Sequence, residues 1–236
     1  MKLKTISLAA LAAITLAGSA SAATITWGAA TTIANSTDVS TNGTQVFGRN
    51  IAVESPSDPN AIVNGANFAW NNPGWTVGFS ELGFPNTFGM TVPTLSGLDA
   101  ANYQAILSSG REAYPTPSGS FTFSNLVMNQ QYELQVWVAD YRAFTNNRTE
   151  TITAAGDSAS PSLTYLDSDG PIHGQFIIGT FTADNTGSIT FTLNGSSVDP
   201  NPTAMYNALQ LRAIPEPSAA LLGGIGMLAL LRRRRA

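Results

Sequence analysis

Hydrophobic and polar positions alternate along much of the second half of the chain. The alternation is clearest over residues 132–138, where one face is apolar and the other carries polar side chains and one tryptophan. The first face holds Tyr132, Leu134, Val136 and Val138, and the second holds Glu133, Gln135 and Trp137. Because the side chains of a strand point alternately to its two faces, this segment is predicted to be a β-strand with Val136 in the core.

Further segments of the second half carry a similar signal. Residues 121–123, 189–193 and 209–211 alternate, and residues 176–181 are apolar on both faces, which is typical of a central strand. The sequence Asp184-Asn-Thr-Gly187 is predicted to be the turn of a hairpin that joins the two strands beside it.

The first half of the chain shows weaker patterns. Strands are predicted at residues 24–27 and 44–47, with one or two more within residues 61–70. Residues 71–94 are rich in glycine, proline and aromatic residues, and we interpret them as a long structured loop over one edge. A short helical turn is expected within residues 98–107, with Asp99 as its N-cap.

The predicted fold class is all-β, because no stretch of the body shows sustained helical periodicity. Strands of this length and spacing favour an antiparallel β-sandwich of the jelly-roll type. Two apolar segments, one at each end of the chain, are predicted to be helices that lie outside this domain.

The N-terminal 22 residues have the three parts of a secretory signal peptide. Lys2 and Lys4 precede an apolar run over residues 6–17, and Ala20-Ser-Ala22 forms a small-residue cleavage site. Residues 1–22 are therefore predicted to be removed on export. The remaining body, residues 23–214, is long enough for one domain with a real core.

The C-terminal segment, residues 215–236, combines a helix breaker, an apolar run and a basic end. Pro215 and Pro217 stop any helix that comes from the domain, since proline lacks the N–H that a helix interior requires. Residues 218–231 are uncharged, and the basic end follows them as Arg232, Arg233, Arg234 and Arg235. As a helix the apolar run spans roughly 21 Å, against a hydrocarbon core of about 30 Å. A short membrane segment with cytoplasmic arginines is predicted.

This arrangement of Pro215-Glu216-Pro217, apolar run and terminal arginines resembles the PEP-CTERM sorting domain. That family occurs on exported proteins of Gram-negative bacteria that make extracellular polysaccharide. The resemblance implies an inner-membrane intermediate, recognition by an exosortase, cleavage near Pro-Glu-Pro, and delivery to the cell surface or extracellular matrix. A plain C-terminal membrane anchor is the alternative interpretation.

The charge of the domain narrows the range of partners. Residues 23–214 carry 5 basic and 14 acidic side chains, a net charge of −9, and no lysine. Such a surface repels phosphate backbones, which argues against nucleic acid as a partner. The chain also contains no cysteine, so no disulfide supports the fold despite the predicted export.

Asp140, Tyr141 and Arg142 are the first candidates for ligand binding, because they end the strongest predicted strand. An aromatic ring beside charged hydrogen-bonding groups is typical of sugar sites. Trp137 lies on the face expected to be exposed, which makes it a candidate platform for stacking a sugar. The alternative is that Asp140 and Arg142 form a structural ion pair and that Trp137 packs beneath another element.

Two more tryptophans, Trp70 and Trp75, are further candidates for stacking. Asp167 and Asp169, followed by glycine, form a fragment of a calcium-binding loop, because carboxylates are hard oxygen ligands. A structural calcium is the one cofactor indicated, with a solvated acidic turn as the alternative. His173 is the only histidine and has no nucleophile motif beside it, so no catalytic residue is assigned.

Residues 103–107, 119–126 and 131–140 resemble jelly-roll domains of the galactose-binding-like type. Together with the C-terminal resemblance, this implies an exported, non-catalytic protein that has a structural or carbohydrate-binding role in the exopolysaccharide layer. Because the domain is acidic, the expected partner is a neutral extracellular polysaccharide. The alternative function is a carbohydrate-active enzyme, either a glycoside hydrolase or a lyase, that acts on the same layer.

Overall fold

A computed structural model of the chain describes residues 24–51, 60–70, 74–142, 148–155, 157, 159–166, 174–197 and 202–215. The predicted signal peptide lies outside these residues. The other predictions that lie outside them concern Asp167, Asp169, His173, Glu216, Pro217, the apolar run and the terminal arginines. No helix in the described ranges is long and apolar enough to span a membrane.

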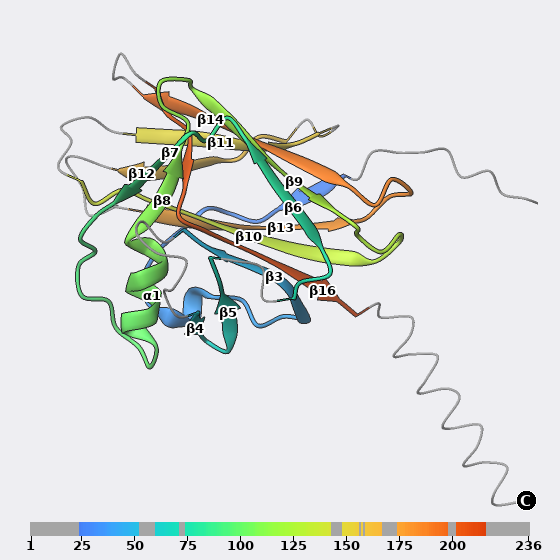
Figure 1. Cartoon of the computed structure of the whole chain (residues 1–236), viewed down its shortest axis with the longest axis horizontal. Coiled ribbons are helices and arrows are strands. Elements are labelled where there is room, and N and C mark those ends of the chain that lie inside the picture. The colour runs from blue at the N-terminus through green and yellow to red at the C-terminus, as the bar shows by residue number, and fades with distance from the viewer. Residues whose placement is uncertain are drawn as a thin grey trace, which may run out of the picture.

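Two antiparallel sheets pack face to face and form a β-sandwich (Figure 1). The first sheet has the order β1 (Ile25–Trp27), β13 (Gly174–Thr182), β10 (Gln131–Ala139), β16 (Ala208–Ile214) and β3 (Thr44–Asn50), with β2 (Thr31–Thr32) also paired to β13. The second sheet has the order β12 (Ser162–Leu166), β11 (Arg148–Ala154), β14 (Ile189–Ser197), β9 (Ser118–Ser124) and β6 (Gly78–Leu82). The predicted all-β sandwich is therefore confirmed.

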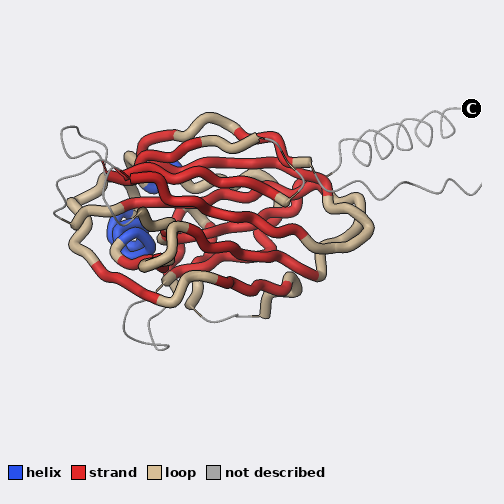
Figure 2. The backbone as a smooth tube through the Cα atoms, turned by 90° about the horizontal axis from the view of Figure 1, so that it is seen from above, coloured by secondary structure: helices blue, strands red, loops and turns tan. Residues whose placement is uncertain are grey.

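Smaller elements surround the two sheets. They are the hairpin of β4 (Ala61–Val63) and β5 (Ala66–Phe68), a three-stranded sheet of β15 (Met205–Tyr206), β8 (Ser109–Glu112) and β7 (Asn86–Gly89), the helix α1 (Ala100–Leu107) and the 3-10 turn Ser36–Asp38. Figure 2 shows the long strands running side by side, with α1 near one end of the sandwich. The sandwich thus has two ends, where the turns lie, and edges such as the one formed by β3 and β6.

The main core lies between the two sheets, where the alternating strands place their apolar faces. Val136 is fully buried there, as its position in the pattern predicts. Phe121 of β9 stacks on Phe191 of β14 with ring centroids 5.3 Å apart, and both rings are buried. Burial of large apolar side chains is the dominant favourable contribution to folding, and it operates here without any disulfide.

The outer face of β10 differs from the prediction, because it is covered rather than exposed. The side chain of Trp137 is fully buried in a second core with residues of α1 and the β4–β5 hairpin. Its indole N–H donates to the hydroxyl of Tyr103 at 3.1 Å, and the ring of Phe68 meets it edge-on at 5.5 Å. Trp137 is therefore not a platform for a sugar, and the prediction of an exposed face is wrong.

The covered face also explains how the polar residues of β10 are accommodated. Gln135 is fully buried, yet it accepts from the backbone N–H of Ser40 at 2.9 Å and donates to the carbonyl of Asp38 at 2.7 Å. Glu133 accepts from the Asn42 amide at 3.0 Å. These partners make up for the water that burial removes.

Two other local predictions need correction. Residues 71–94 were expected to form one loop, but they contain the strands β6 and β7. The turn Asp184–Gly187 was expected to join a hairpin, but it connects β13 of the first sheet to β14 of the second. Alternation identifies the buried face of each strand, but it does not identify the strand beside it.

The predicted helical turn is present as α1, which starts at Ala100. Asp99 occupies the N-cap position, but its side chain makes no capping hydrogen bond to the helix. Its Oδ2 atom instead accepts from the backbone N–H of Asn64 at 2.8 Å, and this bond ties the helix start to the β4–β5 hairpin. The Asp99 side chain thus stabilises a tertiary contact and not the first turn of the helix.

Candidate functional site

The segment that follows β10 holds the residues that sequence analysis selected for ligand binding. Asp140 is fully buried. Its Oδ1 atom accepts from the backbone N–H of Arg142 at 3.0 Å and from the Arg142 Nε at 2.9 Å. Its Oδ2 atom accepts from the Arg142 Nη2 at 2.8 Å. Asp140 and Arg142 therefore lie together, as predicted, but their charged groups bind each other. This geometry matches the structural ion pair that was the alternative interpretation.

More charges complete this group, which we call the Asp140 cluster (Asp140, Arg142, Glu112 and Arg148). The Arg142 guanidinium also reaches Glu112 at 3.1 Å and lies 4.2 Å from the ring centroid of Phe88, while Arg148 approaches Asp140 to 3.7 Å. Burial alone lowers the pKa of Arg142, but the hydrogen bonds and charges of Asp140 and Glu112 raise it above its ordinary value. The cluster fixes the end of β10 to β8 and β11.

Tyr141, the third predicted residue, is only partly exposed. Its backbone N–H lies 3.0 Å from the sulfur of Met90, and burial raises the pKa of its hydroxyl. Asp167 and Asp169 lie outside the described residues, so the predicted calcium remains a prediction. Within the ranges that the structure describes, no three acidic, histidine or cysteine side chains gather in a way that could hold a metal ion.

Glu150 on β11 is a buried acid near the Asp140 cluster. Its side chain is fully buried, its Oε2 atom accepts from the backbone N–H of Met205 at 2.7 Å, and Oε1 has no hydrogen-bond partner among the described residues. Burial raises the pKa of Glu150 well above the ordinary value of a glutamic acid, and the Met205 bond offsets this only in part. The acid therefore holds its proton to higher pH than an exposed glutamic acid does.

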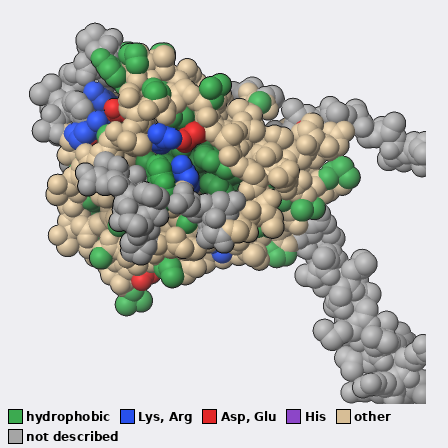
Figure 3. Space-filling view, in the orientation of Figure 1, with side chains coloured by type: hydrophobic (Ala, Val, Ile, Leu, Met, Phe, Trp, Pro, Cys, Tyr) green, Lys and Arg blue, Asp and Glu red, His purple; other side chains and the backbone are tan. Residues whose placement is uncertain are grey.

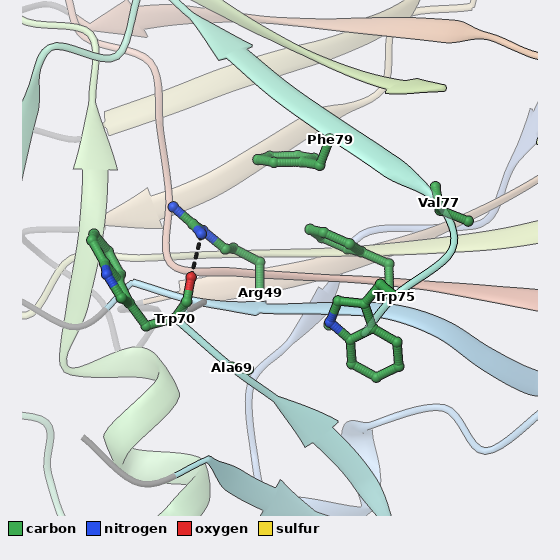
Figure 4. Close-up of a pocket in the computed structure, with 8 residues that line it drawn as sticks. Arg49, Ala69, Trp70, Trp75, Val77 and Phe79 are labelled. Atoms are coloured by element: carbon green, nitrogen blue, oxygen red, sulfur yellow. Dashed lines mark hydrogen bonds between the residues drawn. The ribbon is translucent and has the colours of Figure 1, made fainter. Parts of the chain in front are cut away.

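A pocket opens at the edge of the sandwich where β3 and β6 face each other. We call it the Arg49 pocket, and its lining comprises Phe47, Gly48, Arg49, Ala69, Trp70, Trp75, Val77 and Phe79, with a volume of about 120 Å³ (Figure 4). Figure 3 shows a hollow on this side of the molecule, where apolar and basic side chains meet. Apolar walls with a few polar groups are the usual composition of a small-molecule site.

The local sequence explains how the segment after β5 reaches this edge. The backbone N–H of Ala69 donates to the carbonyl of Gly48 at 3.1 Å, and the N–H of Asn50 donates to the carbonyl of Ala69 at 3.1 Å. A Cβ atom at position 48 would lie 2.1 Å from the carbonyl oxygen of Asn67, so only glycine permits this approach. Gly48 thereby places Trp70 beside Arg49.

Arg49 is the polar centre of the pocket. Its guanidinium lies 4.7 Å from the ring centroid of Trp70 and 5.9 Å from that of Phe79, and it donates to the carbonyl of Trp70 (Figure 4). Among the described residues no carboxylate pairs with Arg49, and its buried Nε has no hydrogen-bond partner. The pocket therefore offers a half-buried cation between aromatic rings, and no carboxylate of the described residues neutralises it.

A second, more open pocket of about 450 Å³ lies next to it along β6. Its lining includes Glu81, Leu82, Phe84, Arg111 and Pro115. Glu81 pairs with Arg111 and also accepts from the hydroxyl of Tyr206, so its charge is matched. Neither of these two pockets is lined by two carboxylates, the arrangement that two-acid glycoside hydrolysis requires.

Sequence analysis identified part of the Arg49 pocket. Trp70 and Trp75 were candidates for stacking, and the structure places both in its lining. Arg49 and Phe79 were missed, because the pocket joins residues 47–49 to residues 69–79, which lie some 20 to 30 positions away in the sequence. The one local signal was a glycine within strand β3, which often marks a close approach of another backbone.

Comparison with known proteins supplies the fold. No protein-family model matches the chain, and no curated protein matches it. Among solved structures, the extracellular domain of ANXUR1 from Arabidopsis thaliana is similar, with a TM-score of 0.51 and 10% identity over 73% of this chain and 49% of that one. The chain thus spans about half the length of that structure. The likeness supports the β-sandwich fold.

Two further structures are similar over part of the chain. The ANX2 ectodomain from Arabidopsis thaliana has a TM-score of 0.49 and 12% identity, over 73% of this chain and 50% of that one. A family 35 carbohydrate binding module from Clostridium thermocellum has a TM-score of 0.32 and 15% identity, over 57% of this chain and 90% of that one.

Proposed function

We propose that the β-sandwich is a non-catalytic carbohydrate-binding module and that the Arg49 pocket is its binding site. The pocket carries this proposal, because it combines three half-buried aromatic rings with a guanidinium that no described carboxylate neutralises. The apolar C–H face of a sugar packs against the rings, and its hydroxyl oxygens accept from Arg49. The ligand is an end or a short stretch of a neutral extracellular polysaccharide.

The charge of the domain supports a neutral chain over a polyanionic one. A long acidic polymer gains one ion pair at Arg49 but meets a domain of net charge −9 along the rest of its path. Each sugar contact contributes modestly, about 1 kcal/mol net. Binding at one pocket is therefore expected in the range of roughly 0.1–1 mM, with avidity when many copies face one polymer.

The binding experiment uses residues 23–214 and two matched variants. Arg49→Gln removes the charge in the pocket, and Arg111→Gln removes an equal charge from the neighbouring pocket, so both domains have the same net charge. We expect binding of a neutral polysaccharide to be lost in the first variant and kept in the second. Equal loss in both, or tighter binding of a uronate polymer than of a neutral one, contradicts the proposal.

We further propose that the C-terminal segment sorts this module to the cell surface. The support is the order of Pro215-Glu216-Pro217, the apolar run and the terminal arginines. The exported protein is cut after Ala22 and again near Pro217, and the intact mass of the surface form checks both cuts. A mature form that retains Arg232 to Arg235 would leave a plain membrane anchor instead.

A further inference from the structure

The turn between β9 and β10 presents two consecutive apolar side chains to solvent. Val127 is 65% exposed and Met128 is 57% exposed, while Leu126 just before them is buried. We call this pair the Val127–Met128 tip. Single exposed apolar residues are common on proteins, but two adjacent ones in a turn are a candidate contact surface.

Backbone hydrogen bonds hold the tip in place on both sides. The N–H of Leu126 donates to the carbonyl of Gly187 at 3.0 Å, and the N–H of Asn129 donates to the carbonyl of Ala183 at 2.9 Å. The N–H of Val127 donates to the Tyr132 hydroxyl at 2.9 Å. The turn is thus fixed against the β13–β14 turn, and its two apolar side chains remain directed outward.

The described chain ends at this same end of the sandwich. Ile214, the last residue of β16, pairs with Gln131, the first residue of β10, and the amide of Gln130 donates to the Ile214 carbonyl. Ile25 of β1 pairs with Phe181, near the same turn. Figure 1 shows the β9–β10 and β13–β14 turns together at this end, with α1 at the other.

We infer that the Val127–Met128 tip enters the interface of the bilayer that holds the C-terminal segment, before that segment is cut. The inference rests on the proposed membrane stage of sorting. Only Pro215, Glu216 and Pro217 separate β16 from the apolar run, and three residues span at most roughly 11 Å. The end of the sandwich that faces the membrane is therefore the end that carries the tip.

The chemistry of this end favours a zwitterionic phospholipid surface. Apolar side chains gain free energy when they leave water for the boundary between head groups and acyl chains. The neighbouring turn carries Asp184, which is partly exposed, and hydrogen bonds from Thr186 lower the pKa of its carboxyl, so it stays ionised. A carboxylate beside the tip is repelled by anionic lipids, so the tip fits a neutral head-group layer better.

The chain contains no cysteine, so one introduced thiol gives one labelling site. The full precursor is made as Met128→Cys, as Leu98→Cys and as Leu222→Cys, each labelled with a polarity-sensitive fluorophore, and is reconstituted into phosphatidylcholine vesicles with nitroxide lipids. Leu98 is fully exposed just before α1, at the other end of the sandwich, and serves as the matched control. Leu222 reports whether the tail inserts.

We expect a blue shift and loss of most fluorescence for the labels at 128 and 222, and neither change for the label at 98. If the label at 222 responds while the label at 128 stays aqueous, the inference is wrong and the proposed membrane stage stands. If neither label responds, the membrane stage is wrong and the inference falls with it. Replacing a third of the lipid by phosphatidylserine should weaken the response at 128 alone.

Discussion

Arg142 and Arg49 show two uses of the same side chain in one sandwich. Arg142 meets two carboxylates, Asp140 and Glu112, and lies over the ring of Phe88. Arg49 also lies over an aromatic ring, but its only hydrogen bond within the described chain goes to a backbone carbonyl. Arg142 is thus held by two ion pairs. Among the described residues Arg49 has no carboxylate partner, and its Nε has no hydrogen-bond partner.

The difference shows that residue types alone do not identify a binding site. Asp140, Tyr141 and Arg142 have the composition of a sugar site, yet the charged groups of Asp140 and Arg142 pair with each other and with Glu112. The Arg49 pocket has fewer polar groups, but its guanidinium has no carboxylate partner among the described residues. The test for function is thus the set of hydrogen bonds that the protein leaves unmade.

The largest expected effect is on stability and concerns the ion pair between Asp140 and Arg142. Asp140→Ala leaves Arg142 and Arg148 without their shared carboxylate in a buried site, and the free energy of unfolding should fall by about 3–5 kcal/mol. Urea denaturation of the parent and the variant measures this. Asp184→Ala, which removes a partly exposed carboxylate from a turn, should lower the urea midpoint far less. An unchanged midpoint for Asp140→Ala would mean that the cluster is not structural, and the predicted ligand site there would regain support.

The second prediction concerns Arg49 and the affinity for a neutral glycan. Arg49→Gln should weaken neutral-glycan binding by about 1.5–3 kcal/mol, roughly tenfold or more, because hydrogen bonds to charged groups are the stronger ones. Calorimetric titration gives the affinity, and a thermal melt should show little change. A variant that loses stability as Asp140→Ala does would put Arg49 in the same structural class as Arg142.

Glu150 gives a third test, because it is a buried acid with one oxygen that has no hydrogen-bond partner among the described residues. Its raised pKa means that the folded protein keeps a proton that the unfolded chain releases above the ordinary glutamic acid pKa. Stability therefore declines as pH rises from about 4.5 toward the raised pKa, by about 1.4 kcal/mol per unit of that shift.

Glu150→Gln keeps the acceptor for Met205 and removes the titration. The variant should match the parent at pH 4 and melt higher than the parent at pH 8. Melting curves at the two pH values provide the comparison. If the parent is the more stable protein at pH 8, the carboxylate is ionised and paired in the fold, which contradicts the assigned direction.

The smallest expected effect concerns Trp70. Trp70→Leu keeps the backbone carbonyl that accepts from Arg49 but removes the ring beneath the guanidinium, at a cost of about 0.5–1 kcal/mol in ligand affinity. A double-mutant cycle with Arg49→Gln measures whether the ring acts through the arginine. Additive losses would show that Trp70 contacts the sugar independently of Arg49.

Much of the sandwich could be predicted from the sequence, because each long strand has its own apolar face. The inward position of Val136 followed directly from the period of two. What surrounds the strands could not be predicted: nothing near Trp137 in the sequence indicates that the β4–β5 hairpin and α1 cover its face. The prediction that residues 184–187 join a hairpin was wrong for the same reason, since strand partners are set by tertiary packing.

The candidate site was predictable only in part. Trp70 and Trp75 were selected by residue type, and that selection placed two of the pocket's three half-buried rings. Arg49 was missed because its role depends on contact between β3 and residues some 20 to 30 positions away, at Ala69, Trp70 and Phe79. Asp140 was selected for its type and position, but whether its oxygens are free is a property of the folded chain alone.

The close approach at Gly48 has a consequence for behaviour at high concentration. β3 is the edge strand of the first sheet, and an edge strand with unpaired N–H and C=O groups is a template for strand addition by another molecule. Here Ala69 and the Asn67–Gln45 hydrogen bonds occupy that edge. A residue without a side chain thus lets the neighbouring segment cover this edge, which keeps the sheet from growing by pairing with another molecule.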